Sequence, residues 1–160
     1  MKIDEIISIL NLKFGESKFK ADFNCTPHAI GVNKNDIVQV CLELQQNPSL
    51  YFDMLSCLTA IDNGVEAKTM EVVYNLYSIP YNIHLMLKVV LPRENAEVDT
   101  VTHIWKTANW NEREAFDMYG INFIGHPDLR RILMPADWEG YPLRKDYKHQ
   151  EYYRDIKVEY

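Results

Sequence analysis

The segment 108–147 constrains the fold more than any other part of the chain, because its composition excludes long regular elements. It contains three glycines, three prolines and two tryptophans among many charged residues. Glycine and proline interrupt helices, and a strand would not carry the basic pairs Arg130-Arg131 and Arg144-Lys145 beside so many aromatic side chains. We therefore expect part of this segment to contact something outside the fold of the chain.

Within this segment the pattern predicts one helix followed by a long ordered arm. Asn109 or Asn111 can cap a helix over residues 110–119, and Gly120 follows as a stop signal. Residues 125–128 are then typical of a turn, and residues 129–134 of a short extended piece. Residues 135–142 are too often interrupted by proline and glycine to form a helix.

The side chains of the arm are suited to binding another protein. Its arginines present planar forks that match carboxylates, and its aromatic residues present large, stiff contact areas. These residues are Arg130, Arg131, Arg144, Trp138, Tyr141 and Tyr147. The arginines could instead pair within the chain, with Asp128, Asp137 or Asp146, and so hold the arm in shape.

The residues before this segment predict an α+β fold. Apolar residues at helical spacing favour two helices, which end at Gly15 and at Asn47-Pro48, and Asn35 or Asp36 can cap the second. Strand patterns cover residues 19–25, 29–32, 51–60, 69–78 and 83–91. Helix, two strands, helix and three strands give a two-layer α+β domain with a mainly antiparallel sheet. We assign residues 1–107 to this core and residues 108–160 to the helix and the extended arm.

Composition limits the function classes. A formal net charge of −6 disfavours general attraction to nucleic acid or anionic lipid. The apolar runs are far shorter than the roughly 20 residues of a membrane span, and the N-terminus does not resemble a secretory signal. Cys25, Cys41 and Cys57 lie far apart in the sequence, which fits reduced thiols in the cytosol.

The sequence carries no pattern that binds a cofactor. Three distant cysteines cannot hold an iron–sulfur cluster alone, and no glycine-rich phosphate loop or zinc motif is present. His126 and Asp128 could form a metal or acid–base pair, but a His-Pro-Asp turn whose side chains satisfy backbone groups is the favoured interpretation. We expect no catalytic, cofactor or metal site in this chain.

Five short motifs in a fixed order resemble one family. They are ERE at 112–114, FDMYGI at 116–121, GHPDLRRIL at 125–133, DWEG at 137–140 and PLRKDY at 142–147. The resemblance is to the C subunit of NADH-quinone oxidoreductase, respiratory complex I, which is the 30 kDa subunit family. It extends upstream through FDMLSCLTAID at 52–62, VYNLYS at 73–78 and LKV at 87–89, and so covers about two-thirds of the chain.

The resemblance implies a role without chemistry of its own. Members of this family are structural parts of the peripheral arm of a proton-translocating complex, on the cytoplasmic side of the cell membrane. They dock against the large D subunit near the quinone-site module, while FMN and the iron–sulfur clusters are held by partner subunits. Two other interpretations of the residues remain: a small metal-dependent hydrolase that uses His126, Asp128, Glu112 and Glu114, and a soluble protein-binding adaptor.

The charges of the predicted helix complete the interface prediction. Arg113 and Asp117 could pair at i,i+4 on a solvated surface. Beside the aromatic and basic arm, we instead expect at least one of these helix charges to meet a partner or to anchor the arm. The predicted subunit interface comprises Glu112, Arg113, Glu114, Asp117, His126, Asp128, Arg130, Arg131, Trp138, Tyr141, Arg144, Asp146 and Tyr147.

Overall fold

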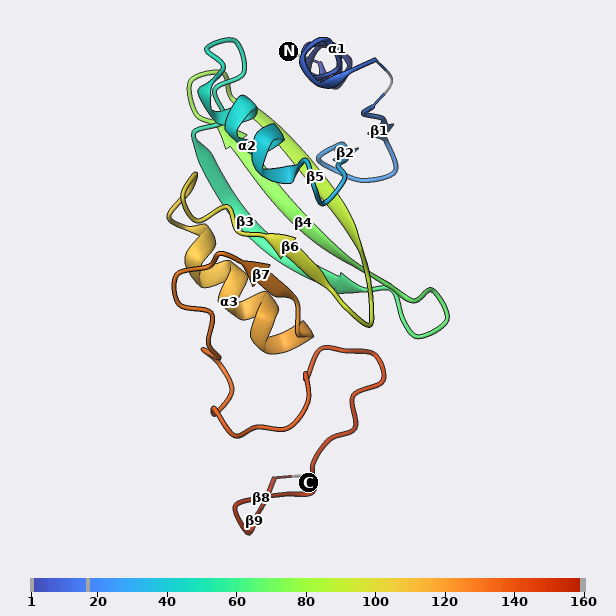
Figure 1. The fold of residues 1–160 in the computed structure, drawn as a ribbon, viewed down its shortest axis with the longest axis vertical. Helices are drawn as coiled ribbons and strands as arrows, with labels where there is room; N and C mark the ends of the chain where they lie inside the picture. The colour runs from blue at the N-terminus through green and yellow to red at the C-terminus, as the bar shows by residue number, and fades with distance from the viewer. Residues whose placement is uncertain (1, 17, 159–160) are drawn as a thin grey trace.

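The computed structural model describes residues 2–16 and 18–158, and its centre is a five-stranded sheet in the order β1-β2-β5-β4-β3 (Figure 1). The strands are β1 (Ala21–Asp22), β2 (Ala29–Gly31), β3 (Met54–Asp62), β4 (Thr69–Ser78) and β5 (Ile83–Pro92). Within this sheet the β2–β5 pairing is parallel, whereas β1–β2, β3–β4 and β4–β5 are antiparallel. The predicted α+β class with a mainly antiparallel sheet is confirmed.

The sheet has one face covered by helices and one face open to solvent. Alternate residues along each long strand point to opposite faces. Leu85, Leu87 and Leu91 of β5 are buried on the inner face. Helices α2 (Ile37–Gln46) and α3 (Ala108–Tyr119) lie over that face, and α1 (Ile3–Phe14) lies at the end of the sheet far from the C-terminus (Figure 1). The outer face carries exposed side chains such as Ile61 and Val90, so the domain has two layers.

The three helices have 12, 10 and 12 residues, and the predicted stop signals end α1 at Gly15 and α3 at Gly120. None of the described helices has the length and apolar character needed to cross a membrane. Neither α2 nor α3 has a side-chain hydrogen bond at its cap. At α2 the predicted Asp36 does occupy the cap position, but its carboxylate pairs with Lys18 at 2.9 Å instead.

The predicted cap of α3 is wrong. The helix begins at Ala108, so Asn109 and Asn111 lie within its first turn instead of before it. The Asn111 side-chain oxygen accepts the backbone N–H of Leu58 at 3.0 Å, which satisfies a donor on the exposed edge of β3. Packing against the sheet therefore decided the role of this asparagine.

The shortest strands differ most from the prediction. The alternating pattern over 19–25 yields only the two residues of β1, because Asp22 accepts the backbone N–H of Asn24 and turns the chain. Two parallel strands, β6 (Glu97–Asp99) and β7 (Asn122–Ile124), were not predicted, and neither was the terminal hairpin of β8 (Tyr152–Tyr153) and β9 (Ile156–Lys157). Runs of two or three residues carry little alternation, and among strands this short only β1 and β2 fall within predicted segments.

Candidate interaction site: the C-terminal arm and its anchors

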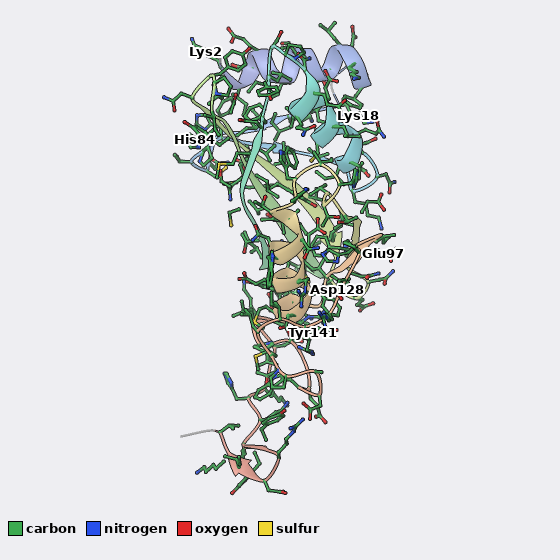
Figure 2. The ribbon with its side chains drawn as sticks, turned by 90° about the vertical axis from the view of Figure 1, so that its left-hand side faces the viewer. Lys2, Lys18, His84, Glu97, Asp128 and Tyr141 are labelled. Carbon is green, nitrogen blue, oxygen red and sulfur yellow. The ribbon has the colours of Figure 1, made fainter. Side chains whose placement is uncertain are left out.

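The C-terminal arm, residues 125–158, runs past the end of α3 and carries the chain away from the sheet (Figure 1). It contains little regular structure apart from the β8–β9 hairpin. Its shape therefore depends on contacts with the rest of the chain. Figure 2 shows Asp128 beside α3 and Tyr141 at the end of that helix, where the projecting part begins.

Asp117 of α3 is the main anchor of the arm. Its side chain is fully buried, and Oδ2 accepts three consecutive backbone N–H groups, from Ile132, Leu133 and Met134, at 2.9, 2.7 and 2.9 Å. Oδ1 accepts a hydrogen bond from Arg131 at 2.7 Å. Burial acts to raise the pKa of Asp117, but these four donors outweigh it and lower the pKa. The carboxylate thus replaces a strand partner for residues 132–134.

Arg113, one helical turn before Asp117, holds the carbonyl groups of the same piece of chain. Its guanidinium donates to the carbonyl oxygens of Arg130 and Arg131 at 3.2 and 3.3 Å, and it lies 5.3 Å from the ring centroid of Trp110. Arg113 and Asp117 therefore do not form a solvated i,i+4 pair. Both are buried, and both anchor the arm, as the second interpretation expected.

A second anchor joins the arm to the end of the sheet. Asp62, at the end of β3, accepts two hydrogen bonds from Arg93 at 2.9 and 3.0 Å and one from the backbone N–H of Lys145 at 2.9 Å. Arg93 also donates to Asp146 of the arm. The pairing with Arg93 holds the pKa of Asp62 well below its usual range. Neither Asp62 nor Arg93 was predicted to contact the arm, because both lie far from it in sequence.

A third contact closes the arm over the end of α3. Arg144 donates to the carbonyl oxygen of Tyr119 at 2.7 Å, and the guanidinium groups of Arg144 and Arg131 lie 4.5 and 5.4 Å from the centroid of the Tyr141 ring. Arg131 also donates to the carbonyl oxygen of Gly140 at 2.9 Å. Three arginines were predicted to bind carboxylates of a partner. Two of them, Arg131 and Arg144, instead bind groups of their own chain, mostly carbonyl oxygens.

The third arginine is different. Arg130 pairs with Asp128 at 3.0 Å, but its side chain is 73% exposed. An exposed pair of this kind contributes only about 0–1 kcal/mol, so Arg130 can exchange Asp128 for a carboxylate of a partner. The alternative prediction, that the arginines of the arm pair with Asp128, Asp137 or Asp146 of the same chain, is thus confirmed for Arg130 with Asp128. Asp137 pairs instead with Arg154, and Asp146 with Arg93.

Glu112 and His126 form a buried cluster beneath the root of the arm. Glu112 accepts the backbone N–H of Val101 at 2.8 Å, its other oxygen lies 2.5 Å from the hydroxyl of Thr100, and burial raises its pKa to about 7. His126 lies 4.0 Å from Glu112 and accepts the backbone N–H of Asp128 through Nδ1. Its Nε2–H therefore donates to the carbonyl oxygen of Asn109, at 3.1 Å. The prediction of a turn whose side chains satisfy backbone groups is confirmed.

This arrangement does not support the hydrolase interpretation. Both ring nitrogens of His126 are occupied by backbone groups, and Glu114 is exposed while Glu112 is buried. Among the described residues, no three His, Cys, Asp or Glu side chains are grouped so that they could hold a metal ion.

Several apolar side chains of the arm are exposed among its charged residues. Leu133 and Ile156 are 61% and 67% exposed, and Leu143 and Tyr152 are also exposed. Trp138 donates from Nε1 to the Tyr147 hydroxyl at 2.9 Å, which holds these two aromatic residues together within the arm. The arm therefore turns its polar backbone groups toward the chain and several apolar side chains toward solvent.

Sequence comparison identifies relatives over most of the chain. The profile of the family described as respiratory-chain NADH dehydrogenase, 30 Kd subunit, matches residues 30–153. The NADH-quinone oxidoreductase C subunit of Chloroherpeton thalassium is 44% identical over 154 residues, which are 95% of this chain and 63% of that protein. The corresponding protein of Chlorobium phaeobacteroides is 43% identical, over 95% of this chain and 92% of its own length. The chain thus spans less than two thirds of the first of these relatives.

Two solved structures share the fold. One, titled Nqo5 of the trypsin-resistant fragment (1-134), has a TM-score of 0.65 and 24% identity, and the match covers 81% of this chain and all of that one. The other belongs to the membrane-bound sulfane sulfur reductase, titled an archaeal respiratory membrane complex. It has a TM-score of 0.74 and 23% identity, over 92% of this chain and 86% of that one.

Proposed function

Because the chain belongs to the family of the 30 kDa subunit of respiratory-chain NADH dehydrogenase, we propose that it is a non-catalytic structural subunit of a proton-translocating NADH-quinone oxidoreductase. It docks through its C-terminal arm against the D subunit, in the peripheral arm of the complex on the cytoplasmic side of the membrane. FMN and the iron–sulfur clusters belong to partner subunits.

The observation that carries this proposal is the orientation of the C-terminal arm. Asp117, Arg113 and Asp62 bind its backbone from the inside, while Leu133, Leu143 and Ile156 face outward. A segment that is already ordered loses less conformational entropy when it binds, so the anchors favour association. Apolar side chains on an ordered segment are typical of the centre of an interface.

The structural relatives support the proposal in two ways. One related fold is titled a trypsin-resistant fragment, as expected if the remainder of that protein is open to protease when it is isolated. The other comes from a respiratory complex whose title names sulfane sulfur instead of NADH. A fold shared between complexes with different substrates is expected of a subunit that binds neither substrate.

Copurification from membranes tests the proposed docking. A tagged chain should be recovered with the D subunit, and the double variant Leu133→Ser with Leu143→Ser should recover at least tenfold less of it. Burying each leucine stabilises an interface by about 1.5–3 kcal/mol, and about 1.4 kcal/mol corresponds to a factor of ten in affinity.

The matched control is Ile79→Ser, since Ile79 is 58% exposed in the β4–β5 turn, away from the arm. It should leave recovery unchanged. Normal recovery of the double variant would show that the arm is not the docking element. Recovery with soluble proteins instead of the D subunit would favour an adaptor.

A further inference from the structure

A groove lies at the start of α3, on a surface separate from the outward side of the C-terminal arm. We propose that it is a second docking surface, and that its occupant is an acidic segment of a partner protein in the complex. The inference rests on the chain working as part of a complex, but not on which partner the arm binds. The groove has a volume of about 690 Å³ and is lined by Thr100, Thr102, His103, Lys106, Asn109, Trp110, Gly125 and Pro127.

Trp110 gives the groove its apolar contact surface. Its side chain is 62% exposed, the highest exposed fraction of any aromatic residue in the described part of the chain. Leaving an indole in water is unfavourable, and tryptophan is enriched among the residues that dominate binding energy at interfaces. The contacts among the described residues leave most of the indole surface open to solvent. A partner side chain packed on the indole would cover it.

The indole is held in place from behind. The guanidinium of Arg113 lies 5.3 Å from its ring centroid, and Arg113 is itself fixed by the carbonyl oxygens of Arg130 and Arg131. A fixed aromatic side chain loses little conformational entropy when a partner binds. The anchor of the arm therefore also preorganises the groove.

The two walls of the groove are joined by buried polar groups. On one side, His126 ties the Gly125–Pro127 turn to α3 through the carbonyl oxygen of Asn109. On the other, Glu112 ties α3 to the Thr100–Val101 backbone. Gly125 has φ +80°, and a Cβ atom there would lie 3.5 Å from the Thr100 side chain, so the turn is in van der Waals contact with the Thr100 segment. The walls of the groove are thus held together by hydrogen bonds to the buried side chains of His126 and Glu112.

Charge identifies the chemistry of the occupant. The lining includes Lys106 and His103 but no Asp or Glu, although the chain as a whole carries a net charge of −6. Lys106 forms no ion pair within the described residues. The nearby Asp128 is paired with Arg130. Asp99, which precedes Thr100, and Glu114, one turn beyond Trp110, both lie outside the lining. A segment with a carboxylate at Lys106 and an apolar side chain on the indole complements this surface.

Photochemical crosslinking in the assembled complex tests the inference. The full chain carries p-benzoylphenylalanine in place of Trp110, and crosslinked peptides are identified by mass spectrometry after ultraviolet irradiation of purified complex. We expect a crosslink to another protein of the complex, within a peptide where Asp and Glu outnumber Lys and Arg. The same probe at Ile79, which is 58% exposed in the β4–β5 turn away from the arm, is the control for nonspecific capture and should give at least tenfold less.

A charge reversal provides the second measurement. Lys106→Glu should reduce the Trp110 crosslink at least fivefold, whereas Lys106→Arg should preserve it and Lys20→Glu, the same change at another exposed lysine, should have no effect. Absence of a crosslink to a partner protein at position 110, a neutral or basic crosslinked peptide, or an unchanged yield in Lys106→Glu would each overturn the inference. The same photoprobe placed at Leu133 reports separately on the arm. Loss of the crosslink at position 110 and loss of the crosslink at position 133 therefore distinguish a wrong groove inference from a wrong docking proposal.

Discussion

At the residue scale, Gly120 decides how closely the arm can approach α3. Its φ is +74°, which favours glycine, and a Cβ atom would lie 2.5 Å from the Tyr141 ring and 2.7 Å from Arg144. Gly15 also ends a helix, α1, with a positive φ of +115°, but among the described residues no neighbouring atom lies within 4 Å of the site of its Cβ. Substituting alanine at each of the two helix ends therefore distinguishes the effect of backbone strain from the effect of steric overlap.

We predict that Gly120→Ala releases the arm and that Gly15→Ala does not. Both variants carry backbone strain of about 1–3 kcal/mol, but only Gly120→Ala must also displace Tyr141 and Arg144. Limited trypsin digestion should therefore cleave the arm of Gly120→Ala at least tenfold faster than that of wild type. Equal cleavage rates in the two variants would show that Tyr141 adapts without loss of the anchor.

A second residue-scale prediction concerns Glu112. Burial raises its pKa to about 7, so the folded chain binds this proton more tightly than the unfolded chain, whose carboxyl has a pKa near 4.5. Its contribution to stability is therefore complete below about pH 4.5 and is lost as pH rises through about 7. At about 1.36 kcal/mol per pKa unit, the loss is about 3 kcal/mol.

Thermal melts between pH 5 and pH 8 check this linkage. The melting temperature of wild type should fall with rising pH, and Glu112→Gln, whose amide does not titrate, should show a smaller fall. The amide can keep one acceptor for the Val101 backbone N–H, so the variant is expected to fold. Identical pH profiles would mean that Glu112 stays ionised in the folded chain.

At the scale of elements, α3 has two separate roles. Ala108 and Ala115 belong to the hydrophobic core, whereas Arg113 and Asp117 bind the start of the arm. The anchors of residues 130–134 therefore lie on the core itself. The later anchors, from Arg144, Lys145 and Asp146, add contacts to α3 and to the end of the sheet without contributing to the core.

Truncation after Pro135 should separate folding from assembly. We predict that residues 1–135 melt cooperatively, because the sheet, the three helices and the Asp117 anchor are retained. Incorporation into the membrane complex should be lost, because the truncation removes most of the outward apolar side chains. Circular dichroism measures the first outcome and copurification the second. Normal incorporation of the truncated chain would contradict arm docking.

At the scale of the whole molecule, the chain is elongated, with α1 and the β8–β9 hairpin at opposite ends (Figure 1). The anchored part of the arm lies between them. A partner that binds the arm could therefore also reach the β8–β9 hairpin (Figure 1).

We also predict that the purified chain carries no iron, flavin, zinc or nicotinamide cofactor. Cys25 is half-buried, Cys41 buried and Cys57 exposed on the sheet, and burial raises the pKa of the Cys41 thiol, which disfavours the thiolate that binds metal. Visible absorbance and elemental analysis of natively prepared protein check this. Stoichiometric iron with acid-labile sulfide would refute it.

The sequence by itself determined the elements whose patterns are long. Residues 3–14, 37–46, 69–78 and 83–92 repeat apolar residues over enough turns or alternations to identify each element and its order. Local chemistry also sufficed at Gly120 and at the His126 turn, because both depend on neighbours in sequence.

Only the tertiary structure decided which predicted charges face inward. Asp117 binds residues 15 to 17 positions away, and Asp62 binds Lys145 from 83 positions away. No local pattern encodes such contacts, since an aspartate in a helix looks the same whether it is solvated or accepts buried backbone N–H groups. The folded sheet brings these groups together, and burial then makes their pairing obligatory, because an unpaired carboxylate or N–H group without water is costly.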